Sequence, residues 1–169
     1  MKILLFSGNH PRHLFVQNAL IKSFEVSGVV GMRREEMLPA PPDGIPPLDA
    51  ENFRRHFHDR RMAEQKYFGD LKAEQVFRKI PIHYCDPKTL NTPETAGFIA
   101  AAKPDVAFIL GVDLIKEPVL SSLPRDRINL HLGLSPWYKG AATLFWPFYN
   151  LEPQYAGSTF HQIIPAADA

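Results

Sequence analysis

The stretch RINLHLGLSPWYKG, residues 127–140, decides the fold of this chain. Its first part alternates, with Ile128 and Leu130 apolar and Asn129 and His131 polar. Successive side chains of a β-strand point to opposite faces, so the alternation predicts a strand that carries an amide and an imidazole side by side. Glycine and a Ser-Pro pair then end the strand in a loop, and loops at strand ends are where open α/β sheets place ligand sites.

Several further segments have the pattern of strands. Two are uninterrupted apolar runs, ILLF at residues 3–6 and VAFIL at residues 106–110, which is typical of central strands buried on both faces of a parallel sheet. Shorter patterns are found at residues 26–32, 80–84 and 157–164. Pro81 predicts an edge position for its strand, because proline cannot donate a hydrogen bond to a central ladder.

Helical patterns lie between these strands, at residues 11–24, 49–77, 92–103 and 117–123. Strands that alternate with helices predict the α/β class: three layers, with a mostly parallel twisted sheet and helices on both faces. The chain has 169 residues, 45% of them hydrophobic, which is enough for one well-buried domain over residues 1–169.

Charge and cysteine content narrow the function classes. The formal net charge of +1 neither supports nor excludes a nucleic-acid partner such as tRNA. Cys85 is the single cysteine, so no internal disulfide can form, and we expect a buried or idle thiol in a reducing compartment. No run approaches the roughly 18 apolar residues of a spanning helix, so we expect a cytoplasmic protein without membrane contact.

The motif at the decisive stretch continues toward the end of the chain. Its spaced elements are Asn129-x-His131, Pro136, Gly140, Gly157-x-Thr159-x-His161 and Asp168. This pattern resembles the N-terminal catalytic domain of the folate-dependent formyltransferases, most clearly over residues 104–168. The family includes methionyl-tRNA formyltransferase, glycinamide ribonucleotide formyltransferase and sugar-nucleotide N-formyltransferases. The resemblance implies their Rossmann-like fold and 10-formyltetrahydrofolate as co-substrate, without a metal.

The resemblance also implies catalytic roles for three residues. Asn129 would stabilise the tetrahedral oxyanion that forms when an amine attacks the formyl group. His131 would bind near the oxyanion or accept the proton of the amine, and Asp168 would orient His131. The glycine of the family's Asp-x-Gly turn is absent because the sequence stops at Ala169. We therefore expect a catalytic domain that is incomplete at its C-terminal end and weakly active or inactive.

Two loops match the ligand-binding loops of the resembled family. Gly111, Asp113, Leu114 and Ile115 fall on the positions that hold the pterin, chiefly through backbone groups. The side chains of Leu110, Val112 and Leu114 could equally belong to the hydrophobic core. The expected substrate loop consists of Gly133, Ser135, Pro136, Lys139 and Gly140. Its sequence Gly-Leu-Ser-Pro differs from Ser-Leu-Leu-Pro, which is more common in the family.

Three segments allow two interpretations each. His10 and His13 line the donor cleft, or they are solvated histidines at a helix start, which we favour. Residues 49–77 form a solvated amphipathic helix, which we favour, or a lid that offers arginines to a phosphate. The aromatic residues between 137 and 149 belong to a core or interface, which we favour, or stack on bases.

The acceptor amine is the least determined part of the function. We expect a small-molecule amine, first an amino sugar linked to a nucleotide. The alternatives are methionyl-tRNA, water, which would make the protein a formyltetrahydrofolate hydrolase, and no acceptor at all in a non-catalytic folate-binding domain. A homodimer is compatible with each of them.

Overall fold

The computed structural model of the protein describes residues 1–33, 38–69 and 71–164. Within these residues one sheet has the strand order β3-β2-β1-β4-β5-β6. The strands are β1 (Lys2–Gly8), β2 (Glu25–Met32), β3 (Ile82–Cys85), β4 (Val106–Leu110), β5 (Asp126–His131) and β6 (Thr159–Gln162). The helices are α1 (Pro11–Ser23), α2 (Pro47–Phe68), α3 (Ala73–Val76), α4 (Pro93–Ala102), α5 (Val119–Ser122) and α6 (Trp146–Tyr149), with a 3-10 turn at Pro153–Tyr155.

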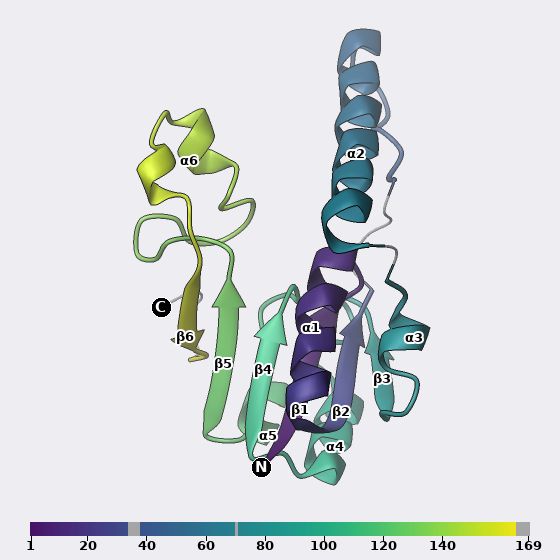
Figure 1. Ribbon diagram of the computed structural model, residues 1–169, viewed down its shortest axis with the longest axis vertical. Coiled ribbons are helices and arrows are strands. Elements are labelled where there is room, and N and C mark those ends of the chain that lie inside the picture. The colour runs from purple at the N-terminus through teal and green to yellow at the C-terminus, as the bar shows by residue number, and fades with distance from the viewer. Residues whose placement is uncertain (34–37, 70, 165–169) are drawn as a thin grey trace.

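The sheet is mostly parallel, and helices cover both of its faces (Figure 1). All neighbouring strands from β3 to β5 run parallel, whereas β6 pairs antiparallel with β5. Helices α1 and α3 lie on one face, and α4 and α5 lie on the other (Figure 1). The predicted α/β class with a three-layer arrangement is confirmed, as are the central positions of β1 and β4 and the edge position of β3.

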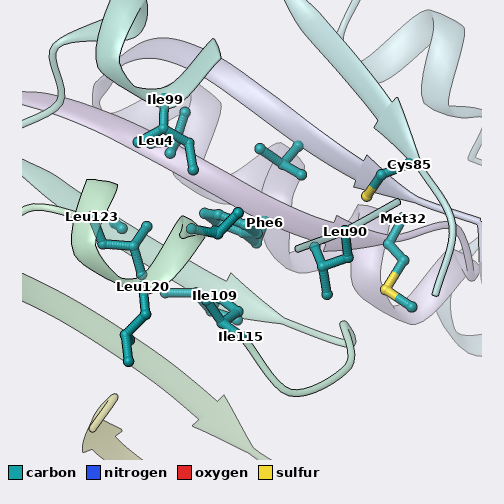
Figure 2. Packing of buried hydrophobic residues seen from close by; sticks show 13 residues of the cluster. Leu4, Phe6, Met32, Cys85, Leu90, Ile99, Ile109, Ile115, Leu120 and Leu123 are labelled. Atoms are coloured by element: carbon teal, nitrogen blue, oxygen red, sulfur yellow. The ribbon is translucent and has the colours of Figure 1, made fainter. Parts of the chain in front are cut away.

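Strand β1 divides its side chains between two hydrophobic clusters. Leu4 and Phe6 pack with the residues beneath α4 and α5 (Figure 2), whereas Ile3 and Leu5 pack beneath α1 and α3. Complete burial of one such side chain stabilises the fold by about 1.5–3 kcal/mol. The uninterrupted apolar run therefore makes β1 the centre of both layers.

Local signals fix the ends of the helices. Pro11 begins α1, and the Thr92 side chain caps α4 by accepting a hydrogen bond from the backbone N–H of Thr95. Helix α4 ends at Lys103, which has a φ of 46° and precedes Pro104. The predicted starts and ends of these two helices agree with the structure to within one or two residues.

Cys85 is a buried thiol at the end of β3, as expected. Burial and, to a smaller extent, the neighbouring carboxylate of Asp86 raise its pKa to about 11. The thiol therefore stays protonated at neutral pH, which makes it a poor nucleophile.

Two parts of the chain project beyond the sheet on the side where the parallel strands end (Figure 1). One is α2, which has 22 residues, and α3 follows it as a separate helix, so the predicted helical region 49–77 is divided in two. The other is the segment around α6, which has only a single helical turn. Among the described residues, no helix is both long and apolar enough to cross a membrane.

The aromatic residues of the second projection are not core residues. The following large apolar side chains are exposed: Trp137, Leu144, Phe145, Trp146, Phe148, Tyr149 and Leu151. Of the predicted assignment to a core or an interface, the core is excluded for these residues, because the segment stands away from the two clusters that the sheet forms with its helices (Figure 1). The assignment to an interface stays a prediction.

Candidate functional site

The carboxyl ends of β1, β4 and β5 border one cavity of about 650 Å³. Its position is the point where the chain leaves β1 toward one neighbour and β4 toward the other, so that the strand order reverses. Open α/β sheets bind ligands at this kind of switch point. The volume lies within the range of about 300–1,000 Å³ that is usual for small-molecule sites.

Asn129 and His131 both line this cavity, as their alternation along β5 predicts. Asn129 lies directly opposite His161 of β6 in the sheet register. The Asn129 amide nitrogen donates to His161 Nε2 at 3.0 Å, while His161 Nδ1 lies 3.2 Å from the Gln162 carbonyl oxygen and donates to it. His161 therefore carries its proton on Nδ1 and fixes the orientation of the Asn129 amide.

His131 is held by the loop that follows its own strand. Its Nε2 lies 3.0 Å from the backbone oxygen of Tyr138, which can only accept, so Nε2 carries a proton. In the neutral ring Nδ1 then holds the lone pair. A Cβ at Gly133 would lie 2.5 Å from both His131 Nε2 and the Tyr138 oxygen. Glycine at position 133 therefore permits the contact between imidazole and carbonyl.

Contacts outside the cavity stabilise the loop that follows β5. The Tyr138 hydroxyl donates to Glu152 at 2.5 Å, and this hydrogen bond raises the pKa of the tyrosine. The Trp137 ring stacks on Tyr155 with ring centroids 5.3 Å apart. These contacts hold in place the carbonyl group that positions His131.

The four residues of the predicted donor loop, Gly111, Asp113, Leu114 and Ile115, all line the cavity. The alternative interpretation, in which Leu110, Val112 and Leu114 belong to the core, holds only in part. Leu110 is buried and Val112 is partly buried against the core cluster, but Leu114 is 45% exposed. The structure thus brings the predicted donor loop and the Asn129/His131 pair into one cavity.

His10 and His13 also line the cavity and are only 3% and 6% exposed. The interpretation of both as solvated histidines is therefore wrong. The His13 ring packs over Gly8 and Gly111, where an added Cβ would overlap it. These glycines lie at the ends of β1 and β4, so absence of side chains at the switch point makes room for an imidazole.

Helix α2 contributes a cationic side to the cavity. Arg60 lines it, as does Arg12 of α1. Glu64, the single buried residue of α2, forms an ion pair with Arg12, and its Oε1 lies 3.6 Å from His10 Nδ1. Burial alone would raise the pKa of Glu64, but the hydrogen bond with His10 and the charge of Arg12 outweigh it and hold that pKa below its ordinary value of 4.5.

Both interpretations of the charged helix therefore have support. Most of α2 is exposed, as a solvated helix requires, yet Arg60 reaches the cavity, as the alternative requires. Sequence reasoning did not identify Arg12 as a residue of the site. The signal that could have found it is its position one turn beyond a central strand.

The remaining predicted residues are distributed differently. Of the predicted substrate loop, Gly140 lines the cavity, whereas Gly133, Ser135, Pro136 and Lys139 are not among the described lining residues. Asp168 lies outside the residues that the structure describes. Over the described ranges, no group of three or more His, Cys, Asp or Glu side chains is arranged to hold a metal ion.

Comparison of sequences finds a relative in Wigglesworthia glossinidia brevipalpis, the bifunctional polymyxin resistance protein ArnA. The two are 32% identical over 116 residues, which make up 65% of this chain. The chain spans 16% of the length of that curated relative. No family model matches the chain.

Comparison of structures finds similar folds in three solved proteins. Phosphoribosylglycinamide formyltransferase from Anaplasma phagocytophilum has a TM-score of 0.62 and 16% identity, over 100% of this chain and 67% of its own. The enzyme from Bacillus halodurans has a TM-score of 0.61 and 15% identity, over 100% of this chain and 75% of its own. Glycinamide ribonucleotide transformylase 1 from Symbiobacterium toebii has a TM-score of 0.60 and 15% identity, over 99% of this chain and 68% of its own.

The motif predicts a resemblance to formyltransferases, and the solved proteins with a similar fold are formyltransferases. The resemblance to the folate-dependent formyltransferases that the motif predicts is therefore confirmed, and the chain has the Rossmann-like α/β fold of these solved proteins.

Proposed function

We propose that this protein transfers a formyl group from 10-formyltetrahydrofolate to the primary amine of a small molecule. One observation carries the proposal: Asn129 and His131 line the same cavity as the backbone loop 111–115, at the switch point of the sheet. A donor held by the loop would present its formyl group to an amide and an imidazole that the structure holds in fixed orientations.

The reaction forms a bond between the amine nitrogen and the formyl carbon and breaks the bond from that carbon to N10 of the folate. Attack of the amine gives a tetrahedral intermediate with a negatively charged oxygen. Asn129 stabilises this oxygen with an amide N–H; a carboxamide has two N–H hydrogens, and the bond to His161 engages one of them. Collapse of the intermediate restores the carbonyl group and releases tetrahydrofolate.

His131 accepts the proton that the attacking amine loses. The lone pair is on Nδ1, because Nε2 donates its proton to the Tyr138 carbonyl. The imidazolium that forms keeps this hydrogen bond, which becomes stronger when the donor is charged. The proton can then pass to N10 as tetrahydrofolate leaves. The family resemblance implies a further role for Asp168, as the residue that orients His131.

The first candidate acceptor is an amino sugar linked to a nucleotide. Two guanidinium groups, those of Arg12 and Arg60, line the cavity and favour an acceptor with an anionic group. The second candidate is phosphoribosylglycinamide, the substrate named for the solved relatives. Both molecules combine a primary amine with phosphate.

The test is a transfer assay on the full chain with 10-formyltetrahydrofolate and each amine, read by mass spectrometry of the formylated product. His131→Ala and Asn129→Ala should each lower the rate about 100-fold or more while the thermal unfolding midpoint stays near that of the wild type. His58→Ala is the matched control, because this histidine is exposed on α2.

Other outcomes point to the alternatives. Release of tetrahydrofolate without an amine would identify a hydrolase. Folate binding without any turnover would identify a binding domain. Near-normal rates in either alanine variant would remove that residue from the mechanism.

A further inference from the structure

We propose that Asn91 is a positioning residue for the folate loop. Its side chain fixes the backbone on both sides of Ile115 and so keeps residues 111–116 in the shape that receives the pterin. This inference rests on the proposed function, in which that loop holds the folate. Asn91 is outside the cavity and would act only through the loop.

The contact is a two-point hydrogen bond from one carboxamide. The Asn91 amide nitrogen donates to the Leu114 carbonyl at 3.0 Å, and the Asn91 side-chain oxygen accepts from the Lys116 backbone N–H at 2.7 Å. Only a side chain with a donor and an acceptor on one planar group can satisfy both. The two backbone groups flank Ile115, which is buried in the core cluster beneath α5 (Figure 2).

Asn91 is itself held by a rigid turn. It follows Leu90, which is fully buried, and precedes Thr92, the cap of α4. The turn closes where the Leu90 N–H donates to the Asp86 carbonyl at 2.9 Å and the Thr89 hydroxyl donates to the Asp86 carboxylate at 2.9 Å. Asn91 therefore links the rigid core to Leu114 and Lys116, which lie 23 and 25 residues further along the chain.

The near end of the loop has its own support. The Asp113 N–H lies 3.3 Å from the sulfur of Met32, which is buried at the end of β2. With the two Asn91 contacts, the loop is fastened at Asp113, Leu114 and Lys116. A ligand that binds backbone groups gains affinity when those groups are ordered beforehand, because less conformational entropy is lost on binding.

The first experiment measures tetrahydrofolate binding to the full chain by calorimetry. Asn91→Ala should weaken binding about tenfold, the effect of one to two hydrogen bonds. Asn91→Asp has the same shape but cannot donate to the Leu114 carbonyl, and it should weaken binding as well. Thr89→Ala is the control: it loosens the same turn and leaves the carboxamide in place, so it should lower the unfolding midpoint without a comparable loss of affinity.

A second experiment separates this inference from the proposed function. Amide hydrogen exchange of Lys116 should be slow in the wild type and in Thr89→Ala, and fast in Asn91→Ala. Wild-type folate binding that is unchanged in both Asn91 variants would overturn the positioning role and leave the proposed function intact. A wild type that binds no folate would overturn both. Unchanged exchange of Lys116 in Asn91→Ala would overturn the structural basis of the inference.

Discussion

The floor and the walls of the cavity are built in opposite ways. The floor consists of the strand ends at residues 8–13, 109–115 and 129–131, and the walls are formed by Arg60 of α2 and by Leu144 and Phe145 next to α6. In the floor His131 and Asn129 each have an assigned partner, the Tyr138 carbonyl and His161. The walls expose charged side chains on α2 and aromatic ones around α6.

The difference indicates how the two tasks of such a site are divided. Groups that must meet a reacting atom within a fraction of an ångström lie on elements whose positions the core determines. In the proposed function, the groups that would select an acceptor lie on elements that contact the core little. Changes in the floor should therefore affect stability or chemistry strongly, and changes in the walls should affect them weakly.

The largest effect is expected for Gly111→Ala in the floor. The added methyl group would overlap the His13 ring, and the φ of 72° is unfavourable for alanine. We expect a loss of about 3 kcal/mol in unfolding free energy and a drop of about 10 °C in the unfolding midpoint. Gly44→Ala is the control, since Gly44 has a similar φ of 77° and open space around it. It should lose only about 1 kcal/mol.

The next largest loss of stability is expected at the ion pair between α1 and α2. Glu64→Gln removes the buried charge that pairs with Arg12, and it should cost about 2 kcal/mol at neutral pH. The pKa of Glu64 is held below 4.5 in the folded protein, so the stabilisation is present above that pH and is lost as the pH falls further. The difference in unfolding midpoint between wild type and variant should shrink accordingly in acid. A difference that persists there would show that the charge is not its source.

A smaller effect is expected when the orientation of Asn129 is released. His161→Phe cannot accept the amide hydrogen bond and should lower kcat about tenfold with little change in folding. His161→Gln offers an amide oxygen in place of Nε2 and should lose less. Equal losses in the two variants would mean that His161 acts in some way other than through Asn129.

The smallest effect is expected for the exposed aromatic side chains of α6, beside the wall. Phe148 is 59% exposed and does not line the cavity. Phe148→Ser should change the unfolding free energy by less than about 0.5 kcal/mol. A large loss of unfolding free energy, measured by urea denaturation, would show that Phe148 is covered in solution. It would contradict the contrast drawn with the floor.

The sequence predicted the structure correctly where the periodicity of neighbouring side chains determines it. Asn129 and His131 could be assigned to one face because strand side chains alternate, and Thr92 and Pro93 marked the start of α4. Apolar runs at β1 and β4 identified the centre of the sheet. These features depend only on neighbouring residues.

It failed where residues distant in the sequence meet. The burial of His13 depends on the approach of Gly8 to Gly111, about a hundred residues later, and no local pattern reports it. The hydrogen bonds of Asn91 to the loop at residues 111–116 are of the same kind. The aromatics near α6 could not be divided between a core and an interface, because composition does not say which other parts of the molecule pack on a segment.

The attachment of α2 through one buried residue has an evolutionary consequence. Glu64 is the single buried residue of α2. The helix can therefore change its length, or most of its surface residues, without disturbing Asn129 or His131. If the protein transfers a formyl group as proposed, selection can adapt it to a new acceptor by changing α2 while the residues at the strand ends stay the same.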